Sequence, residues 1–111
     1  MDNEIKTWLY DIFQSINEID SYYTDKPRKY ADYLSDLKTK RAVERNIEII
    51  GEAVNRILKK DKPVNLENAQ KIIGTRNRIA NGYDKISDDL IWSIVINNLP
   101  KLKEEVQNLL K

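Results

Sequence analysis

Apolar residues recur at steps of three and four along much of the chain, a spacing that places them on one side of a helix. The first stripe runs from Asp2 to about Tyr23 and contains Ile5, Trp8, Leu9, Ile12, Ile16, Ile19 and Tyr23. It ends before Pro27, because proline cannot donate a backbone hydrogen bond inside a helix but is tolerated in a first turn. The pattern predicts one long helix and then a short helix from about Pro27 to Asp36.

A second long stripe covers residues 39–58 and contains Val43, Ile47, Ile50, Val54, Ile57 and Leu58. Gly51 lies inside it, where a glycine costs about 1 kcal/mol relative to alanine. We therefore expect Gly51 to let another helix approach closely. The next helix is expected to be capped by Asn65 and to end near Asn81-Gly82, a pair suited to a left-handed cap. Its apolar residues are Ala69, Ile72, Ile73 and Ile79.

Ser87 and the two carboxylates after it, Asp88 and Asp89, predict the start of a last helix, because a hydroxyl caps free N–H groups and acids favour the positive end of the helix dipole. Its inward residues are expected to be Leu90, Ile91, Ile94, Val95, Leu99, Leu102, Val106 and Leu109. Pro100 should kink or split this helix. These stripes predict an all-α protein, one domain over residues 1–111, folded as an antiparallel bundle of four to five helices.

Composition narrows the range of partners. Nineteen basic and eighteen acidic residues give a net charge of +1, so any contact with RNA must come from a local patch. The absence of cysteine removes thiol nucleophiles and thiolate metal sites, and no metal or cofactor is expected. No apolar run approaches the ~20 residues that cross a bilayer, and no signal peptide is present, so we expect a cytoplasmic protein without membrane contact.

The candidate chemistry lies in residues 76–83, which read Arg76-Asn77-Arg78-Ile79-Ala80-Asn81-Gly82-Tyr83. This segment resembles the Arg-Asn-x-x-x-His-x-Tyr signature of the HEPN superfamily, specifically the HepT-like toxins that pair with minimal nucleotidyltransferase antitoxins of the MntA type. Asn81 stands where that signature has histidine, and the chain contains no histidine at all. Residues 44–53 and 91–106 are similar to two further helices of the family, so the resemblance covers nearly the whole chain.

The resemblance implies a homodimer that cleaves RNA, either tRNA or mRNA, in a reaction that needs no metal. The cleavage site would be shared by the two copies of the motif. Arg76 and Asn81 would then hold the catalytic positions, and Asn77, Arg78 and Tyr83 would contact the substrate. Tyr83 would also be the residue to which the nucleotidyltransferase partner attaches adenylate, close to Arg76 and Arg78. On a regular helix Arg76 and Tyr83 lie nearly above one another while Asn81 lies well round the cylinder, so the motif requires a backbone turn near Gly82.

Attack by a ribose 2′-hydroxyl on the adjacent phosphate needs a group that takes a proton, a group that gives one, and a cation to stabilise the transition state. Arg76 can supply the cation. Histidine normally moves the protons because its pKa is ~6.5, whereas the neutral amide of Asn81 does not titrate. Tyr83, with an ordinary pKa of ~10, is a poor base. Since acid–base groups contribute on the order of 10²- to 10⁴-fold, a strongly impaired or inactive nuclease is predicted.

Three alternatives stay open. The chain can be a catalytically silent HEPN domain that binds RNA, a nucleotide or the nucleotidyltransferase. Asn81 can be an introduced, inactivating change in a protein that is active in its native form. The chain can also be a dimerisation module, for which replacing Arg76 would change only solubility.

Several charged and aromatic residues have simpler interpretations. Asp84, Asp88 and Asp89 are explained as acids near a cap better than as a magnesium site. Glu48 and Glu52 are expected to pair with Arg45 or Arg56 on the helix surface. The basic run of Lys38, Lys40, Arg41 and Arg45 can follow a phosphate backbone but is more typical of a solvated face. Trp8 and Trp92 are expected in the core or in a dimer interface.

Overall fold

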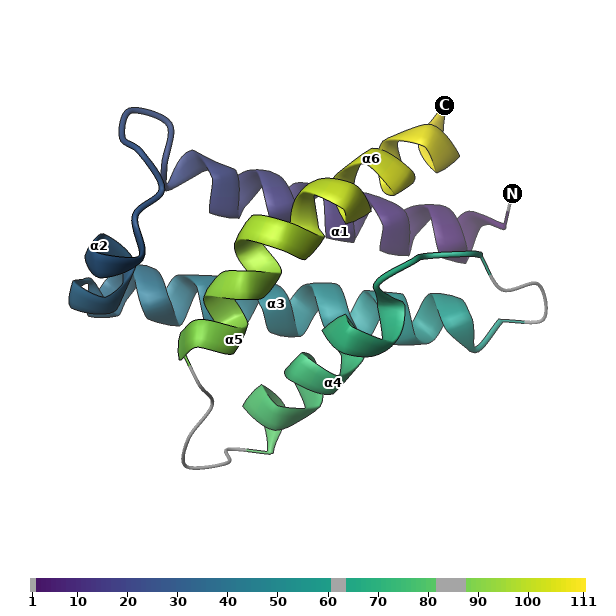
Figure 1. The fold of residues 1–111 in the computed structure, drawn as a ribbon. Helices are drawn as coiled ribbons and strands as arrows, with labels where there is room; N and C mark the ends of the chain where they lie inside the picture. Colours follow the sequence, from purple (N-terminus) through teal and green to yellow (C-terminus); the bar gives the residue numbers. More distant parts are fainter. Residues whose placement is uncertain (1, 61–63, 82–87) are drawn as a thin grey trace.

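Every regular element in the described part of the chain is helical, which confirms the predicted all-α class (Figure 1). The computed structural model describes residues 2–60, 64–81 and 88–111. The elements are α1 (Asn3–Ser21), α2 (Tyr30–Ser35), α3 (Leu37–Leu58), α4 (Ala69–Ala80), α5 (Asp88–Ser93), the π-helical turn η1 (Ile94–Asn98) and α6 (Leu99–Leu110).

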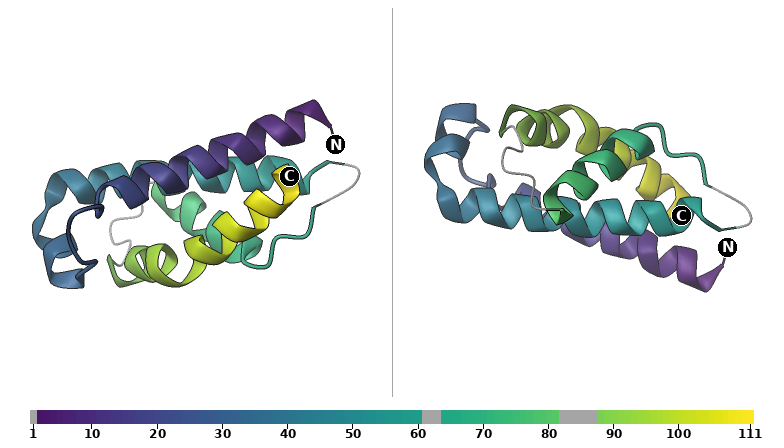
Figure 2. Two further views of the ribbon diagram at one scale, coloured as in Figure 1. Left: turned by 90° about the horizontal axis from the view of Figure 1, so that it is seen from above. Right: turned by 90° about the horizontal axis from the view of Figure 1, so that it is seen from below.

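The two long helices α1 and α3 run side by side in opposite directions, and the other helices pack around them (Figures 1 and 2). The short helix α2 and the amino-terminal part of α3 lie together at one end, α4 crosses α3, and α6 packs on α1. Leu9 and Ile12 of α1 and Ile47 and Ile50 of α3 are fully buried between them. The predicted stripes therefore form the core. Burial of each such side chain contributes roughly 1.5–3 kcal/mol to folding.

Asp36 joins two helices, a role that the sequence pattern did not predict. Its side chain accepts hydrogen bonds from the Thr39 backbone N–H at 3.1 Å and from the Thr39 hydroxyl at 2.7 Å, and it caps α3. The helix therefore begins at Leu37, two residues before the predicted start, and ends at Leu58 as predicted. The same contacts hold the pKa of the Asp36 carboxyl below its usual value.

The predicted start of the short helix at Pro27 is wrong, because α2 begins at Tyr30. The residue before it, Lys29, has an extended backbone and serves as its cap position. The Arg28 guanidinium is instead held at the end of α1 by an ion pair of 2.7 Å with Asp20. Arg28 is thus tied to α1 and lies outside α2.

The prediction that Asn65 caps the next helix is also wrong, since α4 begins at Ala69. Leu66 is buried in the core, so a non-helical segment contributes a core side chain before α4 begins. The backbone N–H of Glu67 donates to the Glu105 carboxylate of α6 at 3.1 Å. The Glu105 side chain thus accepts the hydrogen bond that the side chain of a capping Asn65 would have accepted.

The irregularity predicted at Pro100 lies in the turn before it, where η1 has π-helical hydrogen bonding. Proline has no N–H for the carbonyl four residues earlier, and the Leu99 N–H donates to Ile94, five residues earlier. The helical run continues through this turn into α6. The predicted cap Ser87 lies outside the described residues.

Candidate functional site

The crossing of α4 over α3 is made possible by Gly51, as the sequence predicted. A Cβ atom at this position would overlap Cβ of Arg76 and would lie 2.8 Å from its Cγ and 3.3 Å from the Ile72 carbonyl oxygen. No side chain fits in this space unless α4 moves. The stem of Arg76 is therefore packed directly over the backbone of α3.

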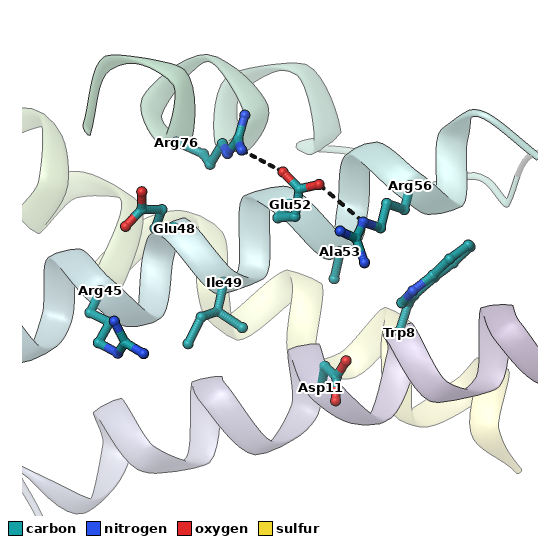
Figure 3. A pocket seen from close by; sticks show the side chains of 9 residues that line it. All are labelled: Trp8, Asp11, Arg45, Glu48, Ile49, Glu52, Ala53, Arg56 and Arg76. Carbon is teal, nitrogen blue, oxygen red and sulfur yellow. Dashed lines mark hydrogen bonds and ion pairs between the residues drawn. The ribbon is translucent and has the colours of Figure 1, made fainter. Parts of the chain in front are cut away.

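The Arg76 guanidinium forms an ion pair with Glu52, the residue next to Gly51 (Figure 3). Nη2 of Arg76 lies 2.5 Å from Oε2 of Glu52, while Oε1 of Glu52 accepts from Nε of Arg56 at 3.0 Å. The predicted pairing of Glu52 with Arg56 is confirmed, and the second pairing, with Arg76, was not predicted. One carboxylate thus lies between two guanidinium groups, and it neutralises part of the charge that a phosphate would meet.

The two other nitrogens of the Arg76 guanidinium differ in their hydrogen bonding. Nη1 donates to Oδ1 of the neighbouring Asn77 at 3.0 Å. Nε is buried and has no hydrogen-bond partner among the described residues. A buried N–H without an acceptor is unfavourable by about 1–3 kcal/mol, so this donor offsets part of the stability that the ion pair with Glu52 contributes.

An open groove of about 470 Å³ runs along α3 beside this ion pair (Figure 3). Its lining residues are Trp8 and Asp11 from α1, Arg45, Glu48, Ile49, Glu52, Ala53 and Arg56 from α3, and Arg76 from α4. The lining includes three arginines and three carboxylates, so their formal charges cancel. Within the groove, a phosphate can be attracted only to a particular guanidinium and not to a broadly positive surface.

The other motif residues lie away from this groove. Asn77 and Arg78 are exposed, and Asn81 is exposed at the end of α4, where its N–H donates to the Asn77 carbonyl at 3.0 Å. Five helical positions separate Asn81 from Arg76, roughly 140° round the axis. The structure therefore does not bring Asn81 to Arg76 within one chain.

Two further expectations concern the end of α4. The helix ends at Ala80 with Asn81 as its C-cap, as predicted, and Asn81 has right-handed backbone angles, φ −84° and ψ −3°. A left-handed cap would lie at the next residue. Gly82 and Tyr83 lie outside the described residues. The roles of Tyr83 in substrate contact and in accepting adenylate therefore stay predictions.

The predicted acids at the start of α5 bind other helices. Asp88 pairs with Lys40 of α3 at 2.9 Å, and Asp89 accepts a short hydrogen bond from the Tyr30 hydroxyl. This hydrogen bond, with burial and the charges of Asp89 and Asp88, raises the pKa of Tyr30 to about 12. Both carboxylates therefore have structural partners at the place where α2 meets α5, which we call the α2–α5 end (Tyr30, Tyr33, Asp88, Asp89 and Trp92).

The basic run is partly neutralised by such pairs. Lys40 is bound to Asp88, and Arg41 pairs with Glu44 at 3.2 Å. In the described ranges, Lys38 and Arg45 form no ion pair, and Arg45 lines the groove. The four basic residues therefore do not form a continuous surface of unpaired positive charge.

The two tryptophans occupy different environments. Trp92 packs against the core and contacts three tyrosines, with ring centroids 5.1 Å from Tyr33, 5.8 Å from Tyr23 and 6.2 Å from Tyr30. Trp8 lies at the edge of the groove, with Nζ of Lys60 5.7 Å from its ring centroid. The aromatic cluster was not predicted, because its members come from α2, α5 and the turn after α1, and so share no helical periodicity.

The described residues include neither a metal site nor a membrane-spanning helix. Within residues 2–60, 64–81 and 88–111, no group of three acidic, histidine or cysteine side chains is placed to hold a metal ion. None of the helices described has the length and apolar character needed to cross a membrane.

The chain was compared with known proteins. A family model described as "Ribonuclease HepT-like" matches residues 12–109. No solved structure matches.

Among curated proteins, a "Putative RNase" of Methanocaldococcus jannaschii is 30% identical, covering 97% of this chain and 88% of that protein. A second protein of that organism, with the same description, is 33% identical over 94% of each chain. A "Probable ribonuclease HepT" of Thermococcus cleftensis is 30% identical over 96% of each chain. The all-helical fold and a match across nearly the whole sequence agree: the chain belongs to the ribonuclease HepT-like family of the HEPN superfamily.

Proposed function

We propose that this protein is the toxin component of a cytoplasmic toxin–antitoxin pair and acts on RNA, with a nucleotidyltransferase as its antitoxin. The observation that carries the proposal is the packing of Arg76 over Gly51 at the edge of an open groove, in a chain of the HepT-like family. Relatives described as RNases support RNA as the substrate. A guanidinium whose stem is fixed at the edge of an open groove is suited to a phosphodiester.

The proposed reaction is cleavage without metal. The ribose 2′-oxygen attacks the adjacent phosphorus and loses its proton, the bond to the 5′-oxygen breaks, and that oxygen gains a proton. Arg76 stabilises the charge on the phosphate in the transition state, Asn77, Arg78 and Asn81 bind and orient the substrate, and Tyr83 contacts it. Because the amide of Asn81 does not titrate, both proton transfers lack an efficient catalyst, and the expected activity is low.

We propose a homodimer as the active form. Within one chain Arg76 faces α3 while Asn81 lies at the exposed end of α4. A second copy would bring another motif to the same phosphate, so that one chain supplies the arginine and its partner supplies Asn81. Sedimentation equilibrium tests this arrangement, and a monomer at micromolar concentration would contradict it.

The alternative function is binding without cleavage, either of RNA or of the nucleotidyltransferase. One observation favours it: the chain has no histidine to move protons. Co-expression with the partner tests the proposed modification. An adenylate-sized mass increase that maps to Tyr83 and disappears in Tyr83→Phe is expected.

The decisive experiment compares this chain with Asn81→His on total tRNA in excess chelator. The Asn81→His variant that also carries Arg76→Ala controls for contaminating nucleases. We expect cleavage by Asn81→His, at least 10²-fold less by the native sequence, and none by the double variant. Equal cleavage by all three proteins would indicate a contaminant, and no cleavage by any would favour the binding function.

A further inference from the structure

Glu52 has an unusual position for a half-buried glutamate. Its two carboxylate oxygens bind two arginines from different helices, Arg76 of α4 at 2.5 Å and Arg56 of α3 at 3.0 Å (Figure 3). A phosphodiester presents two anionic oxygens to guanidinium N–H groups by the same kind of charge-assisted hydrogen bond. The two arginines are therefore already arranged around an anion.

The three side chains differ in how freely they can move. The stem of Arg76 is confined by the backbone at Gly51, and its side chain is 29% exposed. The Arg56 side chain is 57% exposed and that of Glu52 34%, and both border the open groove. Glu52 can therefore rotate into solvent while Arg76 stays in place.

We infer that Glu52 occupies, in the free chain, the place of an RNA phosphodiester, and that RNA binds between Arg56 and Arg76 by displacing the Glu52 carboxylate. This inference rests on the proposed function, because it takes RNA as the ligand. It assigns Arg56 as a second phosphate-binding residue and Glu52 as an internal competitor of RNA. The displaced carboxylate regains water, and the phosphodiester takes over its contacts with the two guanidinium groups.

A purely structural Glu52 has the opposite consequence. If the carboxylate only ties α4 to α3, removing its charge should loosen Arg76 and weaken RNA binding. If the carboxylate competes with RNA, removing its charge should tighten binding. The direction of the change therefore separates the two roles.

The test measures binding of a 2′-O-methyl RNA oligonucleotide by fluorescence anisotropy, since this RNA has no 2′-hydroxyl to attack and cannot be cut. Glu52→Gln is compared with Glu48→Gln. Glu48 lies one helical turn from Glu52, lines the same groove and forms no ion pair within the described ranges, so its substitution removes the same charge without breaking a contact. Glu48→Gln reports the general gain from one less negative charge, about two- to threefold. Glu52→Gln is expected to tighten binding on the order of tenfold, because it also releases two guanidinium groups.

The same pair of substitutions is then made in Arg76→Ala and in Arg56→Ala. The additional gain from Glu52→Gln should fall to that of Glu48→Gln in the Arg76→Ala background and should be clearly reduced in the Arg56→Ala background. Far-ultraviolet circular dichroism and thermal unfolding confirm that each variant is folded.

The possible failures are distinguishable. If the native chain binds RNA and Arg76→Ala weakens binding, yet Glu52→Gln gains no more than Glu48→Gln or binds more weakly, the inference is wrong and the proposed function stands. If no folded variant binds RNA, both the inference and RNA as the ligand are wrong.

Discussion

The α3–α4 crossing and the α2–α5 end both gather charged and aromatic side chains, but they use them differently. At the α2–α5 end, Asp88 binds Lys40, Asp89 binds Tyr30, and Trp92 is covered by tyrosine rings. At the crossing, Arg76 borders an open groove, shares its carboxylate partner with Arg56 and keeps one buried N–H without an acceptor among the described residues. The first region holds helices together, and the second can exchange a partner.

The largest expected effect tests the structural character of the α2–α5 end. Trp92→Ala removes the ring around which three tyrosines pack and should lower the free energy of unfolding by about 3 kcal/mol, the lower end for tryptophan truncation because the ring is only half-buried. Urea unfolding measures the loss. RNA binding by the folded fraction should not change, and a loss as large as that of Arg76→Ala would remove the distinction between the two regions.

The second-largest expected effect tests the close approach of α4 to α3 at Gly51. Gly51→Ala should lower the free energy of unfolding by about 1–2 kcal/mol, because overpacking against Arg76 outweighs the better helix propensity of alanine. Gly74→Ala is the matched control in α4, since a Cβ there meets nothing within 4 Å, and it should stabilise by about 0.5–1 kcal/mol. Equal shifts for the two glycines would show that the close approach is not important.

A smaller effect is expected from the ion pair at the α2–α5 end. Asp88→Asn breaks the contact with Lys40, whose side chain is 19% exposed, and should cost about 0.5–1 kcal/mol. The Arg41–Glu44 pair, in which the Arg41 side chain is 70% exposed, provides a comparison, and Arg41→Gln should cost about 0.2–0.5 kcal/mol. Chemical unfolding at low and high salt separates the two ion pairs, because salt should screen the Lys40–Asp88 pair less than the Arg41–Glu44 pair.

The smallest effect is a dependence on alkaline pH at Tyr30. Asp89 raises the pKa of the Tyr30 hydroxyl to about 12 in the folded chain, so the contribution is complete below the ordinary tyrosine pKa, near 10, and is lost as the pH rises through about 12. The melting temperature should therefore fall more steeply with pH, between about 10 and 12, in the native chain than in Tyr30→Phe. Identical slopes would mean that the contact with Asp89 does not form in solution.

Helix existence followed directly from the spacing of apolar residues, but helix starts did not. Asp36 caps α3 through Thr39, which is a local signal that the sequence contains. The start of α4 is set instead by burial of Leu66 and by the Glu105 carboxylate of α6, contacts that no local pattern reveals. Tertiary contacts moved these boundaries.

The candidate site was predictable to a similar extent. The motif singled out Arg76, and the glycine inside a helical stripe indicated a close approach, which the structure places at the same residue. That Glu52 binds Arg76 depends on how two helices cross, and residues 24 positions apart carry no periodic signal of it. A glycine beside a glutamate was the only local hint.

Gly51 also affects the conformational entropy of ligand binding. The stem of Arg76 loses its rotational freedom when the chain folds, since the backbone of α3 confines it. An immobilised long side chain typically costs about 0.5–1.5 kcal/mol, and for Arg76 this cost falls on folding rather than on binding. The Arg56 side chain is 57% exposed and is held only by its ion pair with Glu52, so more of the cost of ordering it falls on binding. A residue without a side chain thus preorganises the guanidinium that lies above it.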